Sequence, residues 1–288
     1  MDFTLYWFML PIATMVATTA MLSGIGGAAL FTPIFIVIFP LLGPQYPLGS
    51  TVAAIGTALL TETFGFTSGF VGYYRKGLID FRLALRFLKI SVPVAILGAL
   101  VAHLIDDAVL MIGYALLVFI LALVLIFFHH NVTSDDNQKN LQGEKITRTD
   151  RSGRVFEYAS PQLGVVSGVI TSLGAFLTGL LSVGIGEVVV AQLTKRGVPV
   201  AVAAATSVAV VIVTVAAASF TLIGQLIRAG GLSAVPWHLV AYTIPGVIIG
   251  GQIGPRLQGR VSQRTMERAI GVLFIVISIA MTIVVFKR

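Results

Sequence analysis

The stretch that decides the fold is "LSGIGGAALFTP", residues 22–33, which interrupts the first apolar region of the chain. A similar interruption, "LSVGIGEVVVAQ", occupies residues 181–192. Glycine has no side chain, so it permits backbone conformations and close approaches that other residues do not. A break in a membrane helix leaves backbone N–H and C=O groups unpaired, which is tolerated only where protein or a water-filled cavity surrounds them. The two stretches therefore predict two glycine-broken helices that line a site inside a membrane.

The composition is that of an all-α polytopic membrane protein. Hydrophobic residues make up 57% of the 288 residues and charged residues only 11%, against about 25% charged in a soluble domain. Several apolar segments carry no charge over a length that crosses about 30 Å of hydrocarbon. We expect ten helical segments, at residues 5–22, 28–42, 51–73, 83–104, 108–128, 161–181, 187–193, 199–227, 237–254 and 269–286.

The two halves of the chain resemble each other. "GIG" occurs at residues 24–26 and again at 184–186, and "SVPVAILGALVA" (residues 91–102) aligns with "TIPGVIIGGQIG" (residues 243–254). The resemblance predicts three domains, listed here in order: a first membrane repeat at residues 1–128, a polar, solvated cytoplasmic linker at 129–160, and a second membrane repeat at 161–288. Five segments per repeat is an odd number, so the repeats would be inverted relative to each other, as in many secondary transporters. Short segments that enter the membrane and return are an open alternative, and they can preserve this symmetry.

The positive charges predict the orientation of the chain. Basic residues gather in short cytoplasmic loops. If residues 75–89 are cytoplasmic, alternation places the linker, residues 195–196 and residues 256–268 on the same side, and these four regions hold 16 of the 19 Lys and Arg residues. The net charge of +7 is therefore explained by cytoplasmic loops rather than by nucleic-acid binding. We expect a multi-pass protein of the cell (plasma or inner) membrane with the lipid bilayer around it.

The broken helices predict an anion site near the middle of the membrane. A helix that resumes after a break presents unpaired N–H groups and about half a positive charge at its N-terminus, and two such ends from opposed repeats can hold an anion. The alternative is that the glycines only let helices pack closely and that the hydroxyls bond to their own helices. The candidate substrate-binding residues are Ser23, Gly24, Gly26, Gly27, Thr57, Gly184, Gly186, Gln192, Thr206 and Ser207.

Two acidic residues lie deep inside apolar segments. Glu62 is in the middle of "GTALLTETFGFTSG", and Glu187 follows the second Gly-Ile-Gly. A charge at such a depth costs at least about 2.5 kcal/mol, so an acid there is usually functional. A carboxyl group that loads and unloads protons could couple transport to the proton gradient. The alternatives are a neutral Glu62 that hydrogen-bonds to a neighbouring helix and a Glu187 that caps its own helix.

Other kinds of site find little support in the residues. The chain contains no cysteine, its four histidines lie at segment ends or in the linker, and no P-loop occurs, so we expect no metal site, no cofactor and no nucleotide-driven pump. A catalytic site needs a nucleophile beside a base, and neither a G-x-S-x-G motif nor a histidine in mid-membrane is present. We therefore expect no enzyme and no catalytic residues. An intramembrane hydrolase and a passive anion channel are the alternatives to a transporter.

The motifs together resemble the sulfite exporter TauE/SafE family of membrane permeases. The resemblance rests on "SGIGGAALFTP", the following "AAIGTAL", the "YYRKGLIDF" loop, and the weaker second copy "GIGEVVVAQ" with "AAATSVAV". It covers nearly the whole chain apart from the linker. It implies a secondary transporter, a permease or exporter, of small anions such as sulfite, sulfonates and related sulfur-containing anions, working by alternating access around a midplane site.

The second copy departs from the pattern of the first. The resemblance matches Gly24, Gly26, Gly27 and Pro33 to the glycines and the following proline of the family. In the second copy Glu187 stands where Gly27 would be, and Leu193 takes the place of the proline. The substrate site is therefore not expected to be symmetric.

Overall fold

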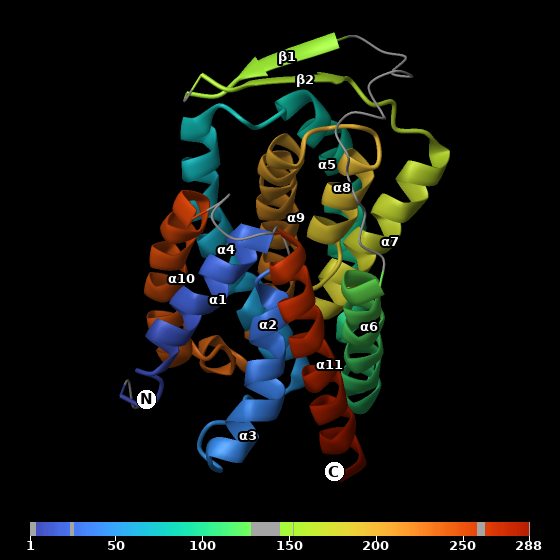
Figure 1. Ribbon diagram of the computed structural model, residues 1–288. Helices are drawn as coiled ribbons and strands as arrows, with labels where there is room; N and C mark the ends of the chain where they lie inside the picture. Colours follow the sequence, from blue (N-terminus) through green and yellow to red (C-terminus); the bar gives the residue numbers. More distant parts are fainter. Residues whose placement is uncertain (1–3, 24–25, 128–144, 152, 258–262, 288) are drawn as a thin grey trace.

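The computed structural model describes residues 4–23, 26–127, 145–151, 153–257 and 263–287 (Figure 1). Each apolar segment expected from the sequence is helical, with ends that differ by a few residues, and the all-α polytopic fold is confirmed. In chain order the helices are α1 (Met9–Ser23), α2 (Ala28–Pro33) continued by a π-helical turn (Ile34–Ile38) and α3 (Phe39–Leu42), α4 (Thr51–Lys76), α5 (Phe81–Ala102), α6 (Asp107–Phe127), α7 (Val165–Leu181), α8 (Ile185–Thr194), α9 (Val200–Gly230), a 3-10 turn (Leu232–Ala234), α10 (Trp237–Leu257) and α11 (Gln263–Lys287).

Local signals explain where the helices around the α4–α5 turn begin and end. The Ser50 side chain accepts a hydrogen bond from the Ala53 N–H at 3.1 Å and caps the start of α4. Gly77 ends α4 in the left-handed region, with φ of +74°, which glycine adopts without steric cost. Asp80 then caps α5 by accepting from the backbone N–H groups of Arg82 and Leu83. The "YYRKGLIDF" motif is therefore a tight turn between two long helices.

The two broken segments are helical hairpins that enter the molecule and turn back. α1 rises from the end where the N-terminus lies, and α2 and α3 return toward that end, whereas α7 descends from the opposite end and α8 returns to it (Figure 1). α1 has 15 residues and α8 has 10, which at 1.5 Å per residue gives about 22 Å and about 15 Å, too short to cross the hydrocarbon. Of the two alternatives left by the sequence, these lengths and directions favour re-entry.

The remaining helices are long. Among the described residues, α5, α6, α9 and Arg268–Val285 of α11 are long and apolar enough to cross a membrane. α4 and α10, with 26 and 21 residues, pack together in the same bundle. Large apolar side chains such as Leu97, Leu116 and Phe220 are exposed on this bundle, as expected for a surface that faces lipid.

The packing partners follow one pattern in both halves of the chain. The first hairpin packs through α1 against α10 of the second half, and the second hairpin packs through α7 against α5 of the first half. α4 contacts α10 as α9 contacts α5, while α4 pairs with α9 and α6 with α11. Two inverted repeats would produce this pattern, in which each of these contacts recurs when the two halves of the chain are exchanged. The inverted repeat itself stays a prediction.

Small residues allow these helices to approach closely. An added methyl group at Gly98 would collide with the carbonyl oxygen of Phe176, and one at Gly179 with that of Ala95, so α5 and α7 touch backbone to backbone. On the α1–α10 contact, methyl groups at Gly246 and Gly250 would meet the carbonyl oxygens of Leu10 and Thr14. The glycines of "GVIIG" (residues 246–250) therefore serve close helix packing. Those of "GVVSG" (residues 164–168) do not, because Gly164 has open space and Gly168 makes only ordinary contact.

Part of the predicted linker is ordered. The sequence predicts a solvated linker over residues 129–160, but β1 (Lys145–Thr149) and β2 (Val155–Ala159) form an antiparallel hairpin that lies across one end of the bundle (Figure 1). The buried Tyr158 hydroxyl donates to Asp80 Oδ2 at 2.7 Å, and Arg148 approaches the same carboxylate at 3.8 Å. Burial and the hydrogen bond to Asp80 raise the pKa of the Tyr158 phenol, so it remains a donor at neutral pH. These contacts tie the linker to the α4–α5 turn, a long-range partner that composition does not reveal.

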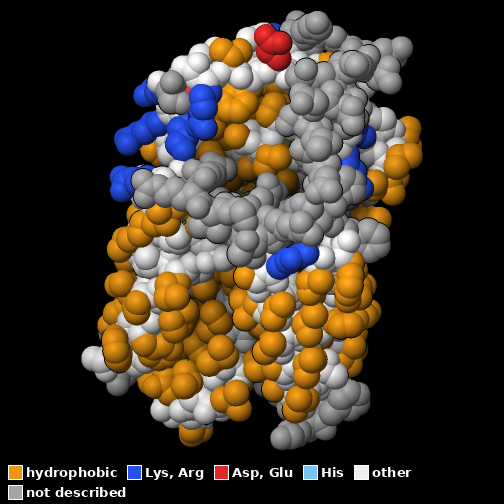
Figure 2. All heavy atoms as spheres, in the orientation of Figure 1, with side chains coloured by type: hydrophobic (Ala, Val, Ile, Leu, Met, Phe, Trp, Pro, Cys, Tyr) orange, Lys and Arg blue, Asp and Glu red, His pale blue; other side chains and the backbone are white. Residues whose placement is uncertain are grey.

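Charge is distributed as the orientation rule expects. Figure 2 shows Lys and Arg side chains gathered toward the end that carries the β-hairpin, while apolar side chains are prominent over the opposite half of this face. Lys76 Nζ donates to the carbonyl oxygen of Pro255 at 2.7 Å, which joins the ends of α4 and α10 on that side. Under the positive-inside rule this is the end expected to face the cytoplasm, and the orientation stays a prediction.

Substituting Gly179 by alanine is expected to destabilise the bundle. The added Cβ would collide with Ala95 and lie 2.8 Å from the backbone nitrogen of Ala99, and overpacking of this kind costs about 1–3 kcal/mol. We expect a lower thermal unfolding midpoint for the purified protein in detergent. Gly224→Ala is the matched control, because no atom outside its own helix lies within 4 Å of the added methyl. An unchanged midpoint for Gly179→Ala would contradict the close α5–α7 contact.

Candidate site where the two hairpins meet

The tips of the two hairpins are in direct contact. The backbone N–H of Gly26, just before α2, donates to Glu187 Oε1 in the first turn of α8 at 3.2 Å. The two residues are 161 positions apart in the sequence. The breaks that the sequence marks as related are therefore brought to one place.

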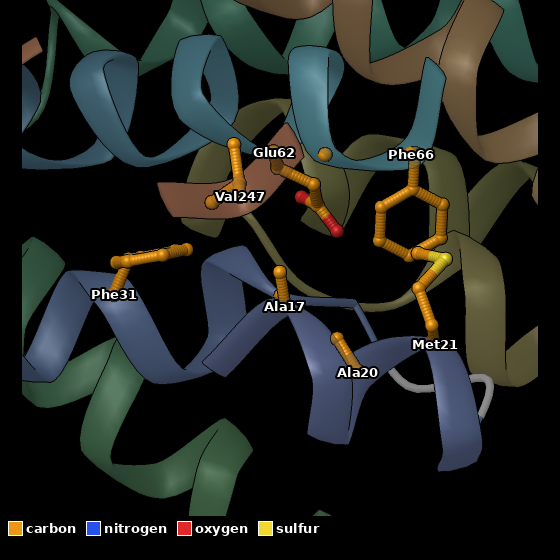
Figure 3. A pocket seen from close by; sticks show the side chains of 9 residues that line it. Ala17, Ala20, Met21, Phe31, Glu62, Phe66 and Val247 are labelled. Carbon is orange, nitrogen blue, oxygen red and sulfur yellow. The ribbon is translucent and has the colours of Figure 1, made fainter. Parts of the chain in front are cut away.

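Glu62 reaches this place from α4. The backbone N–H groups of Gly27 and Ala28, at the start of α2, lie close enough to its carboxylate to stabilise a negative charge. The residue is 2% exposed, and Oε1 has no hydrogen-bond partner among the described residues. Figure 3 shows the carboxylate pointing away from α4, toward α1 and the start of α2. A helix N-terminus predicted to hold a substrate anion thus holds an anionic side chain of the protein itself.

Glu187 occupies the N-terminus of α8 in a similar way. Its carboxylate accepts a hydrogen bond from the Gly26 N–H, and the N–H groups of Gly184 and of Glu187 itself lie close enough to stabilise a negative charge. Its second oxygen, Oε2, is buried and has no partner in the described part of the chain. A carboxylate in the first turn is favoured by the helix dipole and by the unpaired N–H groups there. Glu187 therefore caps α8 with the same carboxylate that lies at the meeting point of the two hairpins.

Gly26 separates the two carboxyl groups. A methyl group on Gly26 would lie 3.0 Å from Glu62 Oε1 and 4.0 Å from Glu187 Oε1. Both oxygens therefore approach the same small volume, and a methyl group there would crowd the Glu62 carboxylate. Within the described residues, neither carboxylate forms an ion pair with a Lys or Arg side chain. Backbone N–H groups supply the stabilisation that a cation would otherwise give.

A cluster of hydroxyls links the same two tips. Thr32 Oγ1 of α2 and Ser182 Oγ, which lies between α7 and α8, are 2.9 Å apart and buried. Both hydroxyls lie close to the hydroxyl of Tyr114 on α6. Tyr114 also donates to the carbonyl oxygen of Ala29 at 2.8 Å. Opening the contact between the hairpins would require these hydrogen bonds to break or rearrange.

Pro33 explains the role of Tyr114. In a regular helix the N–H of residue 33 would bond to the carbonyl oxygen of Ala29, but proline has no N–H. Tyr114 supplies the missing donor to Ala29, and the helix continues after Pro33 as a π-helical turn. A buried carbonyl left unpaired would cost about 1–3 kcal/mol, which accounts for a tyrosine on the facing helix.

Sequence reasoning missed Tyr114 and Ser182 as parts of the site. Tyr114 is the single polar side chain near the centre of α6, "DAVLMIGYALLVFILALVLIF", and this was the available signal. Ser182 adopts a left-handed backbone with φ of 63°, which is uncommon for a residue with a side chain. Its position two residues before the second Gly-Ile-Gly was a weaker signal.

The other candidate residues divide into those at the tips and those elsewhere. Ser207 donates to the carbonyl oxygen of Gly186 at 3.1 Å, and Gly184 turns the chain between α7 and α8 with φ of +137°. Both belong to the tip of the second hairpin. Gly24 lies outside the described residues, as does the side chain of Ser23.

Three predicted residues have other partners or none. Thr206 Oγ1 accepts a hydrogen bond from the backbone N–H of Asp80 in the α4–α5 turn. The Gln192 amide bonds to Ser167 and Thr171 between α7 and α8. Thr57 is buried in α4, and its hydroxyl has no partner among the described residues. The structure does not connect these three side chains to the two carboxylates.

A small pocket adjoins Glu62 and is closed by apolar side chains. Its walls come from α1, α2, α4 and α10 and include Ala17, Phe31, Phe66 and Val247 (Figure 3). The space holds about one water molecule. Glu62 is therefore buried beside a small apolar pocket at the tip of the first hairpin.

Comparison with known proteins identifies the family. The family described as "Sulfite exporter TauE/SafE" matches residues 9–281. The chain is also 24% identical over 269 residues to a protein of Bacillus subtilis described as "Probable membrane transporter protein YunE", covering 90% of this chain and 91% of that protein. No solved structure matches. Because the match runs from α1 into α11 and includes both hairpins, the chain belongs to the TauE/SafE family of membrane transporters.

Proposed function

We propose that this protein is a secondary transporter of small anions, such as sulfite, sulfonates or related sulfur-containing anions. Transport would proceed by alternating access around the site where the two hairpin tips meet. The observation that carries this proposal is the convergence of two helix N-termini on one buried point between re-entrant hairpins. Membership of a transporter family supports the general activity.

The chemistry of the tips suits an oxyanion. The N–H groups of Gly26, Gly27 and Ala28 come from one tip, and the first turn of α8 comes from the other. The hydroxyls of Thr32 and Ser182 lie between the same tips and can donate to the oxygens of a sulfonate or sulfite group. Because neutral donors hold an anion less strongly than a buried Arg or Lys would, cargo can also leave.

Glu62 and Glu187 provide a route for proton coupling. Two unit charges 4 Å apart repel by about 4 kcal/mol at an effective dielectric constant of about 20. An anion that entered beside two ionised carboxylates would meet this repulsion twice. Uptake of a proton by either group removes one of these terms, so we propose that Glu62 and Glu187 carry the protons that accompany the anion.

The exchange of packing partners suggests how access alternates. In the proposed arrangement the repeats, residues 1–128 and 161–288, are inverted and joined by the cytoplasmic linker at 129–160. Each hairpin rests on a long helix of the other half, α1 on α10 and α7 on α5. Movement of one hairpin with its supporting helix would open the site to one side of the membrane, and movement of the other would open it to the opposite side.

Flux measurements on reconstituted protein test the proposed function. We expect liposomes that contain the protein to accumulate labelled sulfite, sulfoacetate or thiosulfate with saturable kinetics, more strongly than acetate and more strongly under a pH gradient. A passive channel would instead give flux that does not saturate and no accumulation against a gradient. Absence of flux for every sulfur-containing anion, in vesicles shown to contain folded protein, would reject the substrate class.

Glu62→Gln is expected to fold and insert but to weaken pH-driven transport. The amide keeps the shape of the side chain and cannot take up a proton. The stimulation of uptake by a pH gradient should fall by about tenfold or more, since one coupled proton contributes about 1.4 kcal/mol per pH unit. Transport with an unchanged dependence on pH would remove Glu62 from the coupling mechanism.

Gly26→Ala is expected to impair transport without unfolding the protein. The methyl group would lie 3.0 Å from Glu62 Oε1 and would take up the space between the carboxyl groups. A penalty of about 1 kcal/mol on anion binding would lower the affinity about fivefold, and we expect a fall of about that size in uptake at low anion concentration. Gly224→Ala, which gains a methyl group in open space, should transport at the rate of the unmodified protein. Equal rates for both variants would contradict the placement of the site.

A further inference from the structure

We propose that the carboxylates of Glu62 and Glu187 are built-in competitors of the transported anion: they occupy the backbone N–H groups of the hairpin tips, and the anion gains these donors only when a carboxyl group takes up a proton. The inference rests on the proposed function and adds to it a physical cause for the coupling. In the absence of substrate the two carboxylates would occupy the binding site, and the transported anion would displace them.

The first observation is that the donors of the tips are already used. The N–H of Gly26 donates to Glu187 Oε1 at 3.2 Å, and Glu62 Oε1 approaches the same glycine so closely that an added methyl group would lie 3.0 Å from it. The N–H groups of Gly27 and Ala28 face the Glu62 carboxylate, and those of Gly184 and Glu187 face the Glu187 carboxylate. A substrate oxyanion therefore cannot bind these N–H groups while both side chains remain where they are.

The second observation is that each carboxyl group has one oxygen without a donor. Glu62 Oε1 and Glu187 Oε2 are buried and have no hydrogen-bond partner among the described residues. A proton added to such an oxygen breaks no existing contact. The group then becomes neutral and gains an O–H donor, and a charged acceptor such as a sulfonate oxygen satisfies that donor. Protonation would thus turn a competitor into a ligand.

Among the described residues near Glu62, few titratable side chains other than Glu187 could take up the proton. The titratable groups that act electrostatically on Glu62 are Glu187 and Tyr114. From α1 and α10, the neighbours of Glu62 around the pocket are apolar, and they include Ala17, Ala20, Met21 and Val247. Tyr114 already donates to Ala29. The proton that accompanies the anion is therefore assigned to the glutamate pair.

Binding measurements separate competition from other roles of the pair. We would measure the affinity of the purified protein for labelled methanesulfonate, which keeps its single charge across the neutral range, as a function of pH. The variants are the Glu62→Gln/Glu187→Gln double variant and each single variant. Glu157→Gln, at an exposed position on β2, is the matched control for loss of one carboxylate. Thermal unfolding confirms that each variant is folded.

We expect the affinity of the unmodified protein and of Glu157→Gln to fall by about tenfold per pH unit above the protonation step, as one linked proton requires. The double variant should bind with no dependence on pH, and at high pH it should bind about tenfold or more tightly than the unmodified protein, because an amide is a weaker competitor than a carboxylate. Each single variant should show an intermediate gain at high pH.

Several results would overturn the inference. A double variant that keeps the pH dependence, or that is folded but binds more weakly at every pH, would show that the carboxylates do not compete with the anion. Binding by the unmodified protein without pH dependence would reject competition and leave anion transport standing. No binding at any pH, together with no flux in liposomes, would reject the proposed function itself.

Discussion

The constraint on which the structure depends is that a backbone N–H group inside a membrane must find an acceptor. The first turns of α2 and α8 begin within the bundle, so their N–H groups have no partner within their own helices. Glu62 and Glu187 supply the acceptors, one from a long neighbouring helix and one from the first turn itself. Two acidic side chains that would otherwise be costly in hydrocarbon are thereby stabilised without a Lys or Arg partner among the described residues.

Several other features follow from keeping that meeting point compact. Gly26 leaves space in which the two carboxyl groups approach each other. Pro33 removes one helical hydrogen bond, and Tyr114 replaces it while it joins the hydroxyls of Thr32 and Ser182. Close backbone contacts, such as that of Gly98 on α5 with α7, hold the hairpins on their supporting helices. Each hairpin is therefore packed closely against a long helix of the other half, α1 against α10 and α7 against α5.

The β-hairpin extends this connection to the outside of the bundle. Asp80 caps α5 and at the same time accepts from Tyr158 of β2, while its backbone N–H donates to Thr206 of α9. One short turn therefore joins α5, α9 and the segment between the two halves. A movement of α5 with the second hairpin would strain the hydrogen bonds of the buried Asp80 carboxylate. Water could replace these bonds only if the turn and the β-hairpin separated, because buried polar groups need partners.

The sequence by itself determined the membrane class, the ten helical segments, the two glycine breaks and the two buried acids, because apolar length, glycine and charge act locally and leave a local pattern. It also indicated the family. Only the tertiary structure decided that the short segments re-enter, that Glu62 binds the start of α2, and that Tyr114 and Ser182 belong to the site. It also placed Thr206 and Gln192 with other partners and ordered residues 145–159 as a hairpin. These features depend on contacts between residues far apart in the chain, and the hydrogen bond from Gly26 to Glu187 spans 161 positions. No local pattern specifies which distant acceptor an unpaired N–H will find, because that choice is made by the packing of whole helices.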